Sequence, residues 1–541
     1  MRDALPTAQD IMDRTFFASQ ADCDKIFTNN PFDYVVIGSG ICAWAFVERA
    51  LGKDPSARIL LLEQGGFFLP QHLQSLSLPY HNIGRQLENF PWVLSNKTQS
   101  APFILGLRGM IPFFGGRSIA WSGWCPRPLR SEMNGWPERV IDAAFDYFVH
   151  AEELLKVIPA NEIPCALQLN VSGEHRGIFS TLQHEITRLL QSNLSRVPAL
   201  TRAFHAPIAM EPPHHKFSTP SLFLSAARCG PGKSRKLQIV ANCSVRRVHQ
   251  RGDRVTTLDT SRGIMNLGEA KLILAMGTIS SAELILNSFP QIWRAGRRLT
   301  AHFISLVVAR IRRSDFKFHR SLASLELGAV YIAGIDEATQ GQYHIQLSAI
   351  SDEDPFKNIE SASRYMPDAV AAPTLEQLSG SAQHVVFVCA AIGEMDHLNK
   401  ENWMRTDGNI EPPANTIIQL IANERDAMVW NVMDETTFST LEDILSPGGA
   451  SRVEYWHEQN NCWRAERPGV RQIRIPAAVH EASTLWIGGD DDAVVGLDYR
   501  LQSLDNIYVT GAGLWPRNGS WNPTLTTVAL SQHLADKLTQ V

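Results

Sequence analysis

The feature that most constrains the fold is a strand-turn-helix-strand unit near the start of the chain. Apolar residues 34–37 precede Gly38-Ser39-Gly40, residues 44–51 have the composition of a helix, and a second apolar run, residues 58–62, ends at Glu63. Short, fully apolar strands joined by a helix are typical of a buried parallel sheet. The sequence therefore predicts an α/β fold that contains a βαβ unit.

The turn at Gly38-Ser39-Gly40 is typical of a nucleotide pyrophosphate site. Gly38 permits a tight turn, Gly40 lets the backbone approach the pyrophosphate, and the helix that follows from Ile41 favours an anion at its N-terminus. Glu63 ends the second strand, where a carboxylate can accept hydrogen bonds from both ribose hydroxyls. A merely structural turn is the alternative, but strand, turn, helix, strand and acid occur here in order. We expect a dinucleotide cofactor, and this unit leaves FAD and NAD both open.

The rest of the chain contains two kinds of strand pattern. Residues 237–240, 246–249, 272–275 and 506–509 have the patterns of short strands, and the last two are followed by Gly277 and by Gly511-Ala512-Gly513. Residues 303–311, 343–350, 384–391 and 416–421 instead suit an antiparallel sheet. We predict a discontinuous Rossmann-like domain (residues 1–160, 226–300 and 476–541) and an α+β substrate-binding domain (residues 161–225 and 301–475) with a large antiparallel sheet.

Composition excludes several classes of partner and site. The 541 residues are 44% hydrophobic and 19% charged, and the net charge of −5 gives no electrostatic basis for binding nucleic acid. No apolar run approaches a membrane span and no apolar signal segment begins the chain, so we expect a cytoplasmic protein without a membrane partner. The eight cysteines, Cys165 and Cys229 among them, are scattered, which predicts reduced thiols and no metal site. A homo-oligomer stays open.

Two polar residues in the last part of the chain are candidates for catalysis. His480 is followed by Glu481-Ala482-Ser483-Thr484, and Asn522 precedes Pro523-Thr524. A neutral imidazole can accept a hydroxyl proton, and an amide can orient the same oxygen. Structural roles are the alternatives, because a histidine after an apolar stretch is often a core residue, while Asn522 and Pro523 suit the N-cap and first position of a helix. Asn522 can have both roles, as catalytic amide and as N-cap. A helix that begins at Pro523 would also direct its positive end toward the cofactor.

Several segments together resemble the glucose-methanol-choline oxidoreductase family. They are the N-terminal unit, Gly115-Gly116-Arg117-Ser118-Ile119-Ala120-Trp121, the residues 274–281, and the segments around His480 and Asn522. The resemblance implies FAD held by the Rossmann-like domain, with the second domain covering the flavin ring. It implies that His480 takes the hydroxyl proton of a small-molecule alcohol while hydride moves to flavin N5, with Asn522 as its partner. Oxygen or another acceptor would then reoxidise the flavin.

The same resemblance assigns the residues that contact FAD. Gly38, Gly40, Ile41 and Glu63 match positions around the ADP half, Val245 matches the strand that meets the adenine, and Gly115, Gly116 and Ser118 match the loop over the pyrophosphate and flavin; Gly277, Gly511, Ala512, Pro523 and Thr524 complete the set. Residues 115–128 most resemble the pyranose-oxidase-like branch, in which a histidine in this loop can be linked to the flavin. Ser118-Ile119-Ala120-Trp121 contains no histidine, so we expect non-covalent FAD.

Two positions depart from the family pattern, and two other functions stay open. Ser483 stands where the family has glycine, and Gly511 stands where it commonly has an acid. A lyase that keeps FAD as a structural group is one alternative, and a non-catalytic FAD-binding protein is another. Residues 300–470 carry no recognisable signature, so the sequence does not specify the alcohol.

Overall fold

The computed structural model describes residues 5–81, 83–100, 107–163, 168–169, 175–211, 215–228, 236–368, 372–408, 411–412 and 414–539. Cys165 and Cys229 lie outside these residues, and the other six cysteines have free thiols. Within the described ranges, no helix combines the length and apolar character that crossing a membrane requires.

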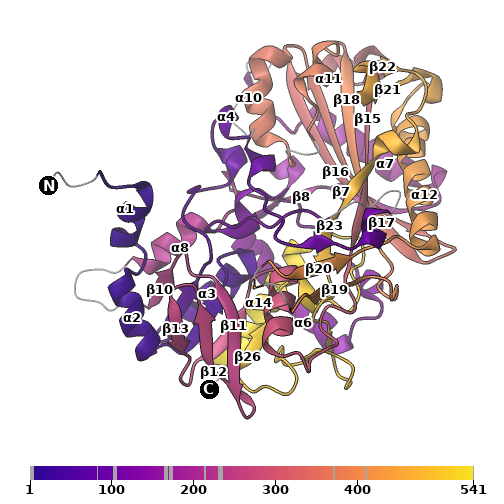
Figure 1. Ribbon diagram of the computed structural model, residues 1–541. Helices are drawn as coiled ribbons and strands as arrows, with labels where there is room; N and C mark the ends of the chain where they lie inside the picture. Colours follow the sequence, from indigo (N-terminus) through magenta and orange to yellow (C-terminus); the bar gives the residue numbers. More distant parts are fainter. Residues whose placement is uncertain are drawn as a thin grey trace.

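A five-stranded parallel sheet forms the lower part of the molecule (Figure 1). Its order is β10 (Leu237–Val240), β2 (Ile59–Leu62), β1 (Tyr34–Ile37), β14 (Lys271–Leu274) and β26 (Ile507–Val509). Each neighbouring pair is parallel, and nearly all strand residues are buried. The βαβ unit predicted from the sequence is confirmed, and the sheet draws its strands from three widely separated parts of the chain.

Helices from both ends of the chain cover this sheet. α3 (Ile41–Lys53) packs against α14 (Thr524–Thr539), which also contacts α6 (Glu138–Leu155). Figure 1 therefore shows the yellow α14 beside the indigo α3. α3 begins before the predicted residue 44, because Gly40 already serves as its N-cap. α9 (Thr278–Ser288) follows β14 and packs on β11 (Val245–Arg251), which pairs with β12 (Arg254–Thr260).

The upper part of the molecule is the predicted large antiparallel sheet (Figure 1). Its strands are β22 (Cys462–Arg464), β21 (Val453–His457), β15 (Thr300–Arg312), β18 (His384–Glu394), β17 (Gly341–Asp352), β16 (Leu325–Asp336) and β7 (Leu200–His205), and β23 (Arg474–Ala482) pairs with β15. The prediction that residues 416–421 join it is wrong. β20 (Thr416–Gln419) pairs instead with β19 (Trp403–Thr406) and β3 (Val93–Leu94), because an apolar strand pattern does not specify its partner.

The register of this sheet gathers polar side chains on one face. His302 of β15 pairs directly with Glu394 of β18, and His344 of β17 pairs with Ile392. Phe303 stacks on Trp430 of α12 (Glu424–Ser439), with ring centroids 4.5 Å apart, so its neighbour His302 points to the opposite face. The sheet thus presents His302 and His344 away from α12, while Glu394, at the end of β18, is bonded to Arg425 of α12. The domain limits proposed from the sequence stay a prediction.

Candidate active site

The turn after β1 leaves open space at the N-terminus of α3. Gly38 has φ +100°, and a Cβ there would lie 2.5 Å from the Ala275 carbonyl oxygen, so only glycine fits. Gly40 caps α3, which begins at Ile41, and a Cβ on Gly40 would meet no atom within 4 Å. Free backbone N–H groups at such a terminus favour an anion. The geometry suits a pyrophosphate.

Glu63 is tied to this turn and to the loop at residue 115. Its Oε2 accepts from the backbone N–H of Ser39 at 3.0 Å and from Ser39 Oγ at 2.6 Å, while Oε1 accepts from the N–H of Gly65 at 2.7 Å. Ser39 Oγ in turn accepts from the N–H of Gly115 at 2.7 Å. Burial raises the pKa of Glu63, and the Ser39 and Gly65 bonds oppose that rise. A carboxylate offers about four acceptor positions, so capacity for a ribose hydroxyl remains.

A second set of bonds joins the same turn to α8 (Pro220–Ala227). Ser118 Oγ donates to the Gly115 carbonyl at 2.7 Å and accepts from the N–H of Thr219 at 3.1 Å. Thr219 Oγ1 donates to the Ser39 carbonyl at 2.7 Å. A Cβ on Gly116 would lie 3.7 Å from the Gly40 Cα. The structure therefore brings Gly38, Gly40, Gly115, Gly116 and Ser118 together; sequence reasoning missed Thr219, which has no local motif.

The segment after His480 is attached to two further glycine turns at the same sheet edge. Thr278 Oγ1, next to Gly277, donates to the Glu481 carbonyl at 2.7 Å. The N–H of Ser483 donates to the carbonyl of Ala512 at 3.1 Å, directly after Gly511. These contacts place the β23 segment over the turns that follow β14 and β26.

His480 has a constrained backbone and a specific side-chain partner. Its φ is +56°, unusual for a residue with a side chain, and its carbonyl accepts from Asn518 Nδ2 at 3.0 Å. His480 Nδ1 lies 3.0 Å from Nδ1 of the fully buried His302, whose Nε2 lies 2.8 Å from the Gly519 carbonyl oxygen. The loop that carries Asn518 and Gly519 thus holds both histidines.

These two contacts determine which nitrogen of His480 is free. The Gly519 carbonyl can only accept, so His302 Nε2 carries the proton and His302 Nδ1 is an acceptor. The Nδ1–Nδ1 contact then requires His480 Nδ1 to donate. Neutral His480 therefore keeps its lone pair on Nε2, as a general base needs.

Burial keeps this histidine cluster neutral. Burial lowers the pKa of His302 to about 4, although the hydrogen bond to Gly519 and the negative charge of Glu394 each oppose part of that decrease. Desolvation also lowers the pKa of His480 well below its ordinary value, with further lowering by His302, His344, Arg117 and Arg108. The side chain can therefore accept a proton throughout the neutral pH range.

We expect these depressed values to make the fold sensitive to acid. Unfolded histidine titrates near pH 6.5 and folded His302 near pH 4, so between them the unfolded chain binds more protons. The contribution of His302 to stability is present above about pH 6.5, falls as the pH drops toward 4, and amounts to about 3 kcal/mol. Urea denaturation at several pH values should give a shallower pH dependence for His302→Asn than for wild type. Equal slopes would contradict this assignment.

Asn522 belongs to a second polar pair on the sheet face. Gln346 Nε2 of β17 donates to Asn522 Oδ1 at 2.9 Å and lies 3.2 Å from His344 Nε2. All three side chains are buried. The Asn522 oxygen is thus used by Gln346 rather than as the predicted N-cap, and its Nδ2 is left as the donor.

The helix that follows Asn522 starts slightly later than predicted. α14 begins at Thr524, and the Pro523 carbonyl accepts from the N–H of Thr527 at 3.0 Å. A Cβ on Gly511 would lie 3.9 Å from Cys42 Sγ of α3. The segment at Gly511 therefore adjoins the start of α3, which follows the Gly38–Gly40 turn. Pro523 lies between Asn522 and the first turn of α14, which Thr524 begins.

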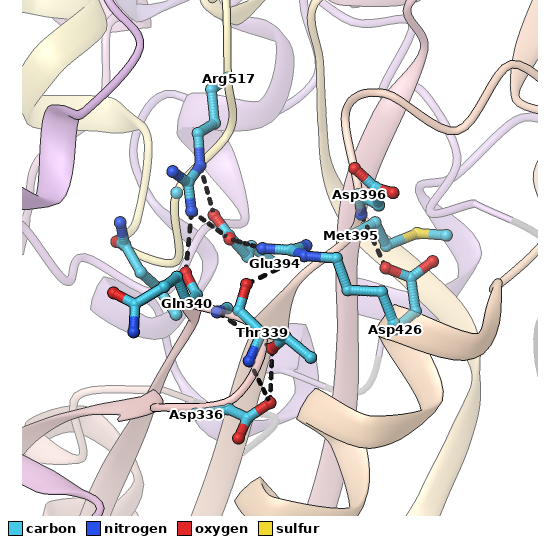
Figure 2. Close-up of polar contacts among 12 residues, drawn as sticks. Asp336, Thr339, Gln340, Glu394, Met395, Asp396, Asp426 and Arg517 are labelled. Carbon is cyan, nitrogen blue, oxygen red and sulfur yellow. Dashed lines mark hydrogen bonds and ion pairs between the residues drawn. The ribbon is translucent and has the colours of Figure 1, made fainter.

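A buried ion pair fixes the loop that carries these residues. Arg517 Nε donates to Glu394 Oε2 at 3.1 Å, and Arg425 Nη2 donates to Glu394 Oε1 at 2.9 Å. Glu394 is 1% exposed, so its charge is balanced by the two guanidinium groups. Figure 2 shows Arg517 directed at Glu394, with a further bond to the Gln340 carbonyl at 3.2 Å. The end of β18 thereby anchors residues 517–522.

The donor and acceptor set fits FAD. Among the described residues, Glu283 Oε1, Glu481 Oε2, Ser483 Oγ and Asn518 Oδ1 are buried without a hydrogen-bond partner. Buried polar atoms are normally satisfied, so each of these atoms indicates a place for a polar ligand group or water. The anion-favouring end of α3 and the acid at Glu63 add the features that a dinucleotide needs.

The two departures from the family pattern have different structural consequences. Ser483 keeps a left-handed backbone, with φ +67°, although a glycine would adopt it without strain. Gly511 also has positive φ, at +89°, and caps the short helix Ala512–Leu514. Neither departure replaces His480, so its Nε2 is still available as a proton acceptor.

The comparisons with known proteins agree with this architecture. Residues 326–531, which include His480 and Asn522, match the family model described as GMC oxidoreductase. A solved structure, pyridoxine 4-oxidase from Mesorbium loti, aligns with a TM-score of 0.58 over 93% of this chain and 98% of that chain, at 17% identity, and has the same fold. The comparison with curated proteins gives no match.

Proposed function

Because this chain belongs to the GMC oxidoreductases, and so to a family of redox enzymes, we propose that it oxidises an alcohol to a carbonyl compound with non-covalently bound FAD. The observation that carries the proposal is the contact between His302 and His480, which leaves Nε2 of a neutral His480 free to accept a proton. Hydrogen bonds tie the segment of this base to the glycine turns and to the loop that leads to Asn522.

In this proposal the chain holds FAD through groups already placed at the sheet edge. Gly40 and Ile41 at the start of α3 face the pyrophosphate, Glu63 accepts from the ribose, and Val245 lies beside the adenine. Gly115, Gly116 and Ser118 cover the other side of the crevice, opposite Gly277, Gly511, Ala512, Pro523 and Thr524. When bound, FAD supplies the acceptor for the hydride that leaves the alcohol carbon.

Side chains of the protein bind the alcohol oxygen and accept its proton. His480 Nε2 accepts the hydroxyl proton, and Asn522 Nδ2 donates a hydrogen bond to the same oxygen. His302 positions His480 because it accepts from Nδ1, and Gln346 positions Asn522 because it occupies Oδ1. The alcohol thereby loses one proton and one hydride and leaves as a carbonyl compound.

Anaerobic spectroscopy tests this proposal against the lyase alternative. Purified protein should be yellow, and an alcohol substrate should bleach the flavin absorption without oxygen. Sugars, amino alcohols, aryl alcohols and sterols form the screen, together with pyridoxine, the compound named for the structural neighbour. Bleaching by one alcohol, and not by its carbonyl product, is the expected result. Protein that takes up no FAD would contradict the proposal, and turnover of a compound without any flavin reduction would favour a lyase.

A further inference from the structure

A cleft beside Glu63 is lined by residues in or next to four elements of the predicted dinucleotide domain. Gln64 follows β2, Val245 begins β11, Met276 follows β14, and Glu283 lies on α9. It adjoins the acid expected to hold the ribose, so a ligand that begins at the α3 turn and passes Glu63 would end there.

The walls of the cleft are fixed by backbone bonds. The N–H of Cys243 donates to the Glu63 carbonyl at 2.8 Å, and the N–H of Asn242 donates to the Gly65 carbonyl at 3.2 Å. These bonds keep the segment before Val245 beside the end of β2. Val245 is buried, and Met276 is partly buried, so the cleft has apolar surface suited to a flat aromatic base.

Glu283 is an unusual residue for this cleft. Its side chain is 6% exposed, and Oε1 has no hydrogen-bond partner among the described residues. Burial raises the pKa of Glu283 to about 7, and the Thr416 hydroxyl partly opposes that rise. Near neutral pH the carboxyl group is therefore often protonated, and then offers one O–H donor beside a carbonyl acceptor. The one other charged residue among the cleft's lining residues, Arg246, is exposed.

We propose that Glu283 recognises the adenine base of FAD through its amino edge, accepting a hydrogen bond from the exocyclic amine and donating one to an adjacent ring nitrogen. Adenine presents such an edge, with the N6 amine as donor beside a ring nitrogen acceptor. On this edge the ring nitrogen is N7. Hypoxanthine keeps N7 as an acceptor and has a carbonyl oxygen in place of the amine, so the acceptor oxygen of Glu283 would face a second acceptor. This inference rests on the proposed function, because it assumes that FAD is the ligand, and it makes Glu283 a determinant of which dinucleotide binds.

The test compares two ligands and three full-length proteins. Flavin is removed, and the affinities for FAD and for flavin hypoxanthine dinucleotide are measured by flavin fluorescence in wild type, Glu283→Gln and Glu283→Leu. Wild type should bind FAD roughly tenfold more tightly than the hypoxanthine form. Glu283→Gln keeps one donor and one acceptor, so its preference should stay within about twofold of wild type. Glu283→Leu should bind FAD roughly tenfold more weakly and lose the preference.

The outcomes separate this inference from the proposed function. Equal binding of both dinucleotides by wild type would overturn the role of Glu283, and this measurement needs no variant that could misfold. Equal preference in wild type and Glu283→Leu, or an equal loss in Glu283→Gln and Glu283→Leu, would also overturn it. No binding of either flavin by wild type would instead contradict the proposed function.

Discussion

Replacement of His480 by alanine is expected to slow reduction of the bound flavin by alcohol about 10²–10⁴-fold, or roughly 3–5 kcal/mol of barrier. In the proposed function the imidazole takes the hydroxyl proton, because the contact with His302 leaves its Nε2 unprotonated. Anaerobic stopped-flow measurement of flavin absorption gives this rate directly. FAD content should stay unchanged, since His480 is not assigned to the cofactor.

His457→Ala is the matched control for this variant. His457 is also a buried histidine with one ring nitrogen on a backbone carbonyl, 2.9 Å from Glu466 O, but it lies on β21 outside the proposed site. Its flavin should be reduced at nearly the wild-type rate. If His480→Ala is reduced as fast as His457→Ala, His480 is not the base.

Glu394→Ala is expected to lower the free energy of unfolding by about 3 kcal/mol. The change leaves Arg517 and Arg425 without their shared buried counter-ion, while both guanidinium groups retain some exposure, which limits the loss. Denaturation by urea, followed by tryptophan fluorescence, measures the effect. Flavin reduction should also slow, because Arg517 anchors the loop that bonds to both His480 and His302.

An exposed ion pair provides the comparison for Glu394. Glu401 pairs with Lys97 at 2.6 Å, but both side chains are more than half exposed. Glu401→Ala should therefore change the unfolding free energy by less than about 1 kcal/mol. Similar losses in the two variants would show that burial of Glu394 does not determine its contribution.

The parts of the site with local motifs could be predicted from the sequence. The turn at Gly38-Ser39-Gly40, the acid at Glu63 and the strand-turn-helix around Gly277 depend on residues that are neighbours in the chain. Parallel strands end at one edge of a sheet, and the order β2-β1-β14 places these three turns side by side there. Their contacts with FAD and the catalytic role of His480 stay predictions.

The partners of the catalytic candidates could not be predicted, because they depend on sheet register. His302 lies in a mostly apolar strand and belongs to no local motif, and its contact with His480 requires the pairing of β15 with β23. His344 and Gln346 alternate with apolar residues in β17, which could have indicated a polar face. That pattern does not show which strand lies opposite, and one residue of slippage would reverse the face.

The most direct test of the account is a crystal structure of the protein grown with FAD. The account predicts the flavin ring between the Gly115–Ser118 loop and His480, with His480 Nε2 and Asn522 Nδ2 directed at the position of the substrate oxygen. A flavin ring on another side of the molecule, with His480 out of reach of a substrate bound to it, would contradict the account.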